Sequence, residues 1–166
     1  MRFWLDRGEV VVIGEDRARG AYILLLRNDE DGWIWIGKRK LYFKQGYYIY
    51  CGSAMNNLKK RISRHFSYEK RLRWHIDYIS IKMQPLLAFA IISEEKIECW
   101  LSKLIGKLFE AFDEFGASDC SCRTHLFYSP SNPIHKLETL LRENRLSFTL
   151  YYEIPNPAGK RLFNLR

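Results

Sequence analysis

The sequence predicts an α+β fold, in which a small, mainly antiparallel sheet is flanked by helices. Short apolar runs bounded by glycine, asparagine and aspartate dominate the first part of the chain, as expected for strands joined by turns. Later stretches place apolar residues three or four positions apart, which is the period of a helix with one buried face. With 166 residues, no internal repeat and no long linker, the chain fits a single domain over residues 1–166 that buries its own core.

Several segments have the character of β-strands. Residues 21–26 are almost all apolar, which predicts a central strand buried on both faces. The turn-forming residues 28–32 separate it from residues 33–37, which we expect to return as its hairpin partner. The other expected strands span residues 10–13, 47–51, 86–92 and 147–154.

Three helices are expected. Residues 57–66 place an apolar side chain every four positions, and this leaves Arg61 and His65 together at the edge of the apolar stripe. Ser93 can cap a long second helix that continues to residue 112, with Glu98 at the border of its apolar face. Asn132-Pro133 starts a third helix.

A strongly basic stretch accompanies the first helix. Lysine and arginine number 27 against 19 acidic residues, a net charge of 27 − 19 = +8. Between residues 59 and 73 a single acid, Glu69, stands among basic residues, namely Lys59, Lys60, Arg61, Arg64, Lys70, Arg71 and Arg73. Such a local excess predicts contact with the phosphate backbone of nucleic acid. The alternative is an ordinary solvated helix face.

Nothing in the sequence indicates a membrane or secreted protein. No apolar run reaches the roughly 18 residues of a membrane span, and residues 1–7 lack the apolar stretch of a signal peptide. The cysteines, at positions 51, 99, 120 and 122, are too few and too irregularly spaced for a secreted disulfide scaffold. We therefore expect a cytoplasmic protein that does not bind membranes.

Separated motifs in this chain together resemble the signature of the GIY-YIG nuclease superfamily. Gly20-Ala21-Tyr22 opens an apolar strand, as the first half of that signature does, and Tyr50-Cys51-Gly52 closes another strand, like the second half. The segment Asn57-Leu58-Lys59-Lys60-Arg61, followed by His65, resembles the superfamily's helix with an essential arginine. Glu98 stands early in a later helix, at the place of the superfamily's metal-binding glutamate.

The resemblance covers about residues 20–128. Within it, residues 74–78 and 118–127 resemble a prokaryotic branch of the superfamily, whose members are sometimes fused to an endonuclease III-type DNA-repair glycosylase. The chain departs from the pattern in the long spacing between Tyr22 and Tyr50, which the segment around Trp33 fills. This insertion could reshape the substrate groove, so the substrate preference of other members is not carried over.

The resemblance implies a metal-dependent endonuclease that hydrolyses DNA, with a place in DNA repair; RNA stays open as a substrate. It assigns one Mg²⁺ or Mn²⁺ ion to Glu98 and the scissile phosphate to Arg61, whose planar charged fork suits a phosphate. Either Tyr22 or Tyr50 would activate or orient the attacking water. A lone phenol has a pKa near 10, so it would need help from Arg61 and the metal. His65 could bind the phosphate or orient a tyrosine.

Two further groups could form polar sites. His75 and Asp77 are two residues apart and would share a face of a strand, either as a second polar cluster near the site or as a structural pair. Cys120, Cys122 and His125 offer soft metal ligands within six residues. A structural zinc site needs a fourth ligand, so local turn structure is favoured over zinc.

Two alternatives to the enzyme remain. The first is a catalytically inactive nucleic-acid-binding module with the same fold and basic face. The second is a small interaction domain stabilised by zinc, which depends on the cysteine cluster alone.

Overall fold

The computed structural model describes residues 17–154 and 162–164. The strand expected at residues 10–13 lies outside the described residues. No helix in the described part of the chain is long and apolar enough to cross a membrane.

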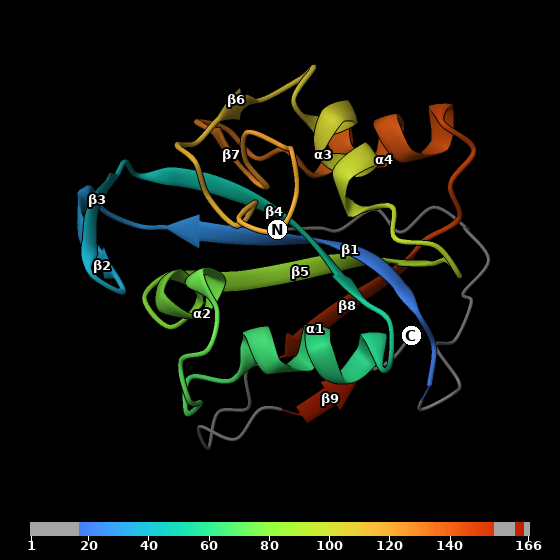
Figure 1. Cartoon of the computed structure of the whole chain (residues 1–166), viewed down its shortest axis with the longest axis horizontal. Helices are drawn as coiled ribbons and strands as arrows, with labels where there is room; N and C mark the ends of the chain where they lie inside the picture. The colour runs from blue at the N-terminus through green and yellow to red at the C-terminus, as the bar shows by residue number, and fades with distance from the viewer. Residues whose placement is uncertain (1–16, 155–161, 165–166) are drawn as a thin grey trace.

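In the described part of the chain, seven strands form a central sheet (Figure 1), in the order β6-β7-β4-β1-β5-β8-β9. All of the neighbouring strands pair antiparallel. The strands are β1 (Gly20–Asn28), β4 (Gly46–Ala54), β5 (Gln84–Ile92), β6 (Glu110–Ala111), β7 (Leu126–Ser129), β8 (Thr149–Ile154) and β9 (Leu162–Asn164). The predicted α+β architecture with a mainly antiparallel sheet is therefore confirmed.

Helices cover both faces of the sheet. Helices α1 (Leu58–Phe66) and α2 (His75–Ser80) lie on one side, and α3 (Glu98–Ile105) and α4 (Ile134–Glu143) lie on the other (Figure 1). Strand β1 contributes alternate residues to the two cores: Leu24 packs in the core with α1 and α2, and its neighbour Ile23 in the core with α3 and α4. Burial on both faces explains why the β1 sequence is continuously apolar.

The prediction that residues 33–37 form a hairpin with β1 is wrong. Strand β2 (Gly32–Ile36) pairs instead with β3 (Arg39–Phe43) in a separate two-stranded sheet. The turn between them includes Gly37, whose φ of 62° is readily adopted only by glycine. Both edges of β1 are already occupied by β4 and β5, so β2 has no edge of β1 to pair with.

The second helix is much shorter than expected. Ser93 does not cap it, because the Ser93 hydroxyl accepts a hydrogen bond from the backbone N–H of Glu95 within a local turn. Helix α3 begins only at Glu98 and ends at Ile105, where Gly106 follows. The chain then forms the short strand β6 at Glu110–Ala111. Helix α1, with Asn57 as its N-cap, agrees with the expected helix at residues 57–66.

Candidate functional site

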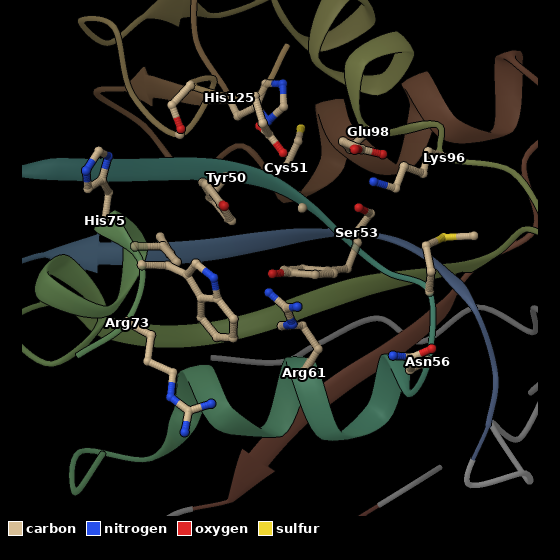
Figure 2. A pocket seen from close by; sticks show the side chains of 18 residues that line it. Tyr50, Cys51, Ser53, Asn56, Arg61, Arg73, His75, Lys96, Glu98 and His125 are labelled. Carbon is tan, nitrogen blue, oxygen red and sulfur yellow. The ribbon is translucent and has the colours of Figure 1, made fainter. Parts of the chain in front are cut away.

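A cavity of about 550 Å³ opens among β1, β4, α1, the start of α3 and the loop that precedes β7. Its lining includes the predicted residues Tyr22, Tyr50, Arg61, Arg73, His75, Glu98 and His125. Arg61 points into it from α1, Glu98 from α3 and Tyr50 from β4 (Figure 2). The fold therefore brings residues that are far apart in the sequence to one place.

The two tyrosines meet because β1 and β4 are neighbours. In the strand register Tyr22 lies opposite Gly52, two residues beyond Tyr50. A side chain at Gly52 would collide with the phenol of Tyr22, so glycine is required there. The two phenol rings have centroids 6.3 Å apart. Strand pairing thus places both hydroxyl-bearing rings at the wall of the cavity.

His65 is completely buried and holds Tyr22 in place. Its Nε2 atom lies 2.7 Å from the Tyr22 hydroxyl oxygen, whereas its Nδ1 atom is buried without a hydrogen-bond partner in the described part of the chain. A buried N–H group without an acceptor costs more than a buried lone pair without a donor. We infer that the proton is on Nε2, so that His65 donates a hydrogen bond to Tyr22. The Tyr22 hydroxyl then keeps its own proton free for another partner.

Burial favours the uncharged forms of His65, Tyr22 and Tyr50 at neutral pH, as the directions of their pKa shifts show. Burial, followed by the charge of Lys70, lowers the pKa of His65 to about 3. Burial raises the pKa of Tyr22 well above its ordinary value and also raises the pKa of Tyr50, while Arg61 opposes both changes. Neither phenol is therefore a ready base at neutral pH. Additional positive charge in the cavity would be needed to stabilise a phenolate.

Arg61 is held by stacking rather than by an ion pair. Its guanidinium carbon lies 3.9 Å from the centroid of the Trp74 ring, which is close enough for a cation–π interaction. None of the ion pairs formed within the described residues involves Arg61. The stack orients the side chain while its N–H donors stay available to a ligand.

Glu98 is the first residue of α3, and one of its carboxylate oxygens has no partner. The Oε2 atom is buried and makes no hydrogen bond to any described residue. Buried carboxylate oxygens without a protein donor are costly, and a cation is one of the groups that would satisfy them. Asp119, on the loop before β7, contributes a second carboxylate to the cavity wall.

The side chains of the basic run differ in exposure and in their hydrogen-bond partners. Arg64 donates a hydrogen bond of 2.6 Å to the buried carboxylate of Asp77, and Lys70 donates to the Ser80 hydroxyl and to the Arg64 carbonyl. These two cations, predicted to bind nucleic acid, thus also connect α1 with α2. Lys60, Arg71 and Arg73 are exposed, and Lys59 is half-buried.

The expected pairing of His75 with Asp77 on one face of a strand is wrong, because both residues belong to α2. His75 is exposed and lines the cavity, whereas Asp77 is buried on another side of the helix. In a helix, side chains that are two positions apart point in different directions. Asp77 is a structural residue whose carboxylate accepts hydrogen bonds from the backbone N–H groups of Arg73 and Trp74.

Removing the Asp77 carboxylate should destabilise the protein strongly. We expect Asp77→Ala to lower the free energy of unfolding by about 3 kcal/mol at neutral pH, because it removes the carboxylate partner of Arg64 and leaves two backbone N–H donors without their acceptor. Asp29→Ala, which removes the exposed ion pair with Arg27, should cost under about 1 kcal/mol. Chemical denaturation of both variants measures the difference, and equal small losses would contradict the structural role of Asp77.

The destabilisation should also depend on pH. Burial alone would raise the pKa of Asp77, but hydrogen bonds from Arg73, Trp74 and Arg64 together hold it below its ordinary value. A carboxyl with a lowered folded-state pKa stabilises the protein above its unfolded-state pKa and loses that contribution as the pH falls through the folded-state value. The difference between wild type and Asp77→Ala should therefore shrink in acid.

Three residues of this region were not predicted from the sequence as site residues. Trp74 stacks on Arg61, Asp119 lines the cavity, and Cys99 lies beside the predicted cysteine cluster. Trp74 and Asp119 belong to residues 74–78 and 118–127, the two segments that resemble one branch of the superfamily. That resemblance could have identified both residues as candidates. Cys99 directly follows Glu98, but nothing in the local sequence connects it with residues 120–125.

Cys120, Cys122 and His125 lie close together with Cys99, so that the group has four metal-binding side chains rather than three. The argument against zinc from a missing fourth ligand is therefore wrong. His125 also belongs to the wall of the cavity.

One family model matches the chain, that of the domain of unknown function DUF123, over residues 21–146. No curated protein and no solved structure gives a significant match.

Proposed function

The chain belongs to the DUF123 family of domains of unknown function, and we propose that it is a divalent-metal-dependent endonuclease that hydrolyses phosphodiester bonds of DNA. The observation that carries the proposal is the meeting of Tyr22, Tyr50, Arg61 and Glu98 around one cavity. The sequence resemblance to GIY-YIG nucleases supports the same assignment of roles. A cavity of about 550 Å³ is large enough for a nucleotide-sized part of a substrate.

The residues present suit a hard divalent cation at Glu98. Mg²⁺ and Mn²⁺ prefer oxygen ligands and are commonly held by one or two carboxylates together with substrate phosphate oxygens. The unpartnered, buried oxygen of Glu98 is such a ligand, and Asp119 is the other carboxylate among the described lining residues. When bound, the ion would supply positive charge for the phosphate in the transition state.

Arg61 provides the second positive charge. A guanidinium group offers a planar fork of N–H donors that fits two oxygens of one phosphate. The stack on Trp74 fixes the direction of this fork before substrate arrives, and preorganised donors stabilise developing charge without a cost of reorganisation. We therefore assign Arg61 to the non-bridging oxygens of the scissile phosphate.

The tyrosines orient the attacking water and handle its proton. His65 donates to the oxygen of Tyr22 in the inferred tautomer, which positions that hydroxyl and stabilises negative charge on it. Because the phenol pKa values are raised, a tyrosine would accept the proton of the water only as a phenolate that has already lost its own proton to solvent, and the charges of Arg61 and of the cation nearby would have to stabilise this phenolate. Cleavage is therefore expected to depend strongly on the divalent cation.

The exposed cations beside the cavity are proposed to bind the DNA backbone. Lys60→Ala combined with Arg73→Ala should reduce the dependence of the binding constant on salt, since each phosphate contact contributes about 0.9 to the slope of log K against log [salt]. Lys107→Ala combined with Lys136→Ala is a control with the same change of charge, because both of these residues are exposed on the α3 and α4 side.

Fluorescence anisotropy over a range of salt concentrations measures both slopes. A lower slope for the first double variant and an unchanged slope for the control are expected. Equal slopes for the two variants would place the DNA-binding surface elsewhere on the molecule.

The proposal as a whole is tested by incubating the full chain with labelled duplex, branched, nicked and single-stranded DNA. Strand breaks are expected with Mg²⁺ or Mn²⁺ and not without a divalent cation. Binding without cleavage of any substrate would favour the catalytically inactive binding module instead.

A further inference from the structure

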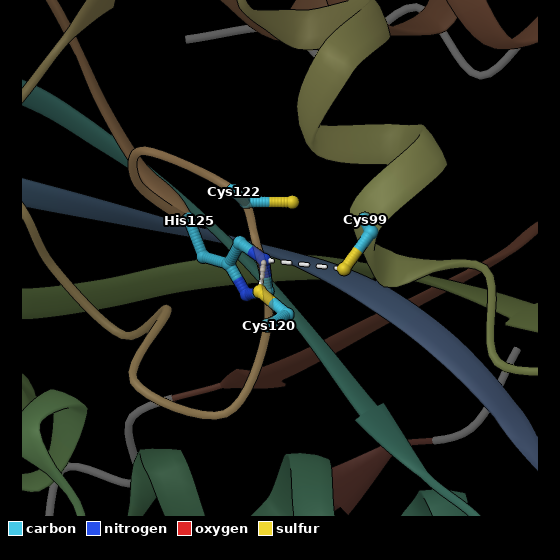
Figure 3. A group of neighbouring side chains, drawn as sticks. All are labelled: Cys99, Cys120, Cys122 and His125. Carbon is cyan, nitrogen blue, oxygen red and sulfur yellow. Dashed lines mark hydrogen bonds between the residues drawn. The ribbon is translucent and has the colours of Figure 1, made fainter.

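A second group of potential metal ligands lies beside the cavity, apart from Glu98 and the tyrosines. It comprises Cys99 at the start of α3 and Cys120, Cys122 and His125 on the loop before β7 (Figure 3). The ligand atoms of these residues all lie within 4.8 Å of one another. His125 is buried and the cysteines are half-buried, and all three cysteines are free thiols.

The spacing of these atoms suits a tetrahedral metal. The Nε2 atom of His125 lies 3.4 Å from the sulfur of Cys120 and 3.7 Å from the sulfur of Cys99. Zinc bonds of about 2.3 Å to sulfur and about 2.0 Å to nitrogen place neighbouring ligands of a tetrahedron roughly 3.5–3.8 Å apart. The cluster therefore needs only small side-chain movements to surround one ion.

We propose that Cys99, Cys120, Cys122 and His125 bind one structural Zn²⁺ ion. Three thiolates and one imidazole match the preference of zinc, whereas Mg²⁺ and Mn²⁺ prefer oxygen ligands. A structural zinc site has four protein ligands and no open position, and this cluster supplies four. The proposal does not depend on the nuclease reaction, because it concerns a separate set of ligands.

Such an ion would join three walls of the cavity. Cys99 is adjacent to Glu98 at the start of α3. The backbone carbonyl of His125 accepts a hydrogen bond from Cys51 in β4, and its N–H donates to Phe115 at the beginning of the loop. Zinc would thereby fix α3 and the loop that carries Asp119 against β4, next to Tyr50. Its role is to position Glu98 and Asp119 rather than to take part in the reaction.

The first test is the metal content of the full-length protein, purified under reducing conditions without added zinc or chelator. Elemental analysis should give one zinc per chain, released when the thiols are modified with a mercurial reagent. Protein stripped of metal and refilled with Co²⁺ should show the intense visible bands of tetrahedral cobalt and a thiolate-to-cobalt charge-transfer band. Weak octahedral cobalt bands would overturn the proposal.

Ligand variants with a matched control provide the second test. Cys99→Ser and Cys122→Ser should each lose most of the zinc and the charge-transfer intensity. Cys51→Ser, which alters a buried cysteine outside the cluster, should keep one zinc per chain. If the ligand variants fail to fold, metal removal from wild type gives the answer: chelation should lower Tm, and Zn²⁺, but not Mg²⁺, should restore it.

Two outcomes would overturn the proposal. One is wild-type protein that contains less than a tenth of an equivalent of zinc and whose Tm does not change when Zn²⁺ is added. The other is a disulfide among the cluster cysteines in protein purified under reducing conditions. Neither outcome bears on metal-dependent cleavage at Glu98, so failure of the zinc site and failure of the nuclease proposal are distinguishable.

Discussion

Glu98→Gln is expected to slow DNA cleavage by about a hundredfold or more, which corresponds to a barrier increase of roughly 2.7 kcal/mol. Glutamine keeps the shape and helix propensity of glutamate but removes the charge that would hold a divalent cation. Because the Glu98 Oε2 atom has no hydrogen-bond partner among the described residues, the substitution breaks no observed contact of that atom. DNA binding should stay constant or tighten slightly, because the substitution removes one negative charge from the cavity that is proposed to bind the phosphate.

Glu95→Gln is the matched control for this prediction. Glu95 is exposed and lies three residues before Glu98. Its substitution by glutamine changes the net charge by the same amount. Cleavage under single-turnover conditions, with binding followed separately, should distinguish the two variants. Similar rates for Glu98→Gln and Glu95→Gln would show that Glu98 is an ordinary helix-terminal acid.

Arg61→Ala is expected to reduce cleavage to a similar extent, while binding weakens by only about one phosphate contact. The Arg61 guanidinium group stacks on Trp74 and points into the cavity from α1 (Figure 2). Arg61→Lys should not restore full activity, since lysine keeps the charge but lacks the planar fork. This comparison separates a positioned donor from a general attraction for DNA.

Lys82→Ala serves as the control for Arg61, because Lys82 is exposed and lies outside the cavity. Thermal unfolding should show little loss of stability for Arg61→Ala, since the side chain makes none of the described ion pairs. A large loss of stability, or equal cleavage by the Arg61 and Lys82 variants, would contradict the catalytic assignment.

Local sequence patterns predicted the main elements but not all of their partners. The apolar runs predicted β1, β4, β5 and β8, and the four-residue repeat with the Asn57 cap predicted α1. The same apolar pattern could not show that β2 pairs with β3 rather than with β1, because pairing depends on which strand edges are occupied. Helix α3 was predicted too long because apolar periodicity continues through the turn at Gly106.

The site was only partly predictable, because it also depends on which distant segments the fold brings together. Tyr22, Tyr50, Arg61 and Glu98 were found through a resemblance, since no local pattern marks them as neighbours. Counting charges treated Arg64 and Lys70 as free cations, whereas Asp77 and Ser80, which lie outside the basic run, engage them. Cys99 was missed because its partners follow it by more than twenty residues, and only the fold brings them together.

Metal-dependent cleavage by this cavity can be measured by comparing wild type with the variant that lacks the proposed cation ligand. Wild type and Glu98→Gln are purified in parallel and incubated with the panel of end-labelled DNA structures in Mg²⁺, in Mn²⁺ and in chelator. Because a chelator could also remove zinc from the cysteine cluster, Mg²⁺ is then added back alone and together with Zn²⁺. We expect strand breaks by wild type that need Mg²⁺ or Mn²⁺ and that fall about a hundredfold or more in Glu98→Gln. Absence of wild-type cleavage on every substrate, or equal cleavage by the two proteins, would contradict this expectation.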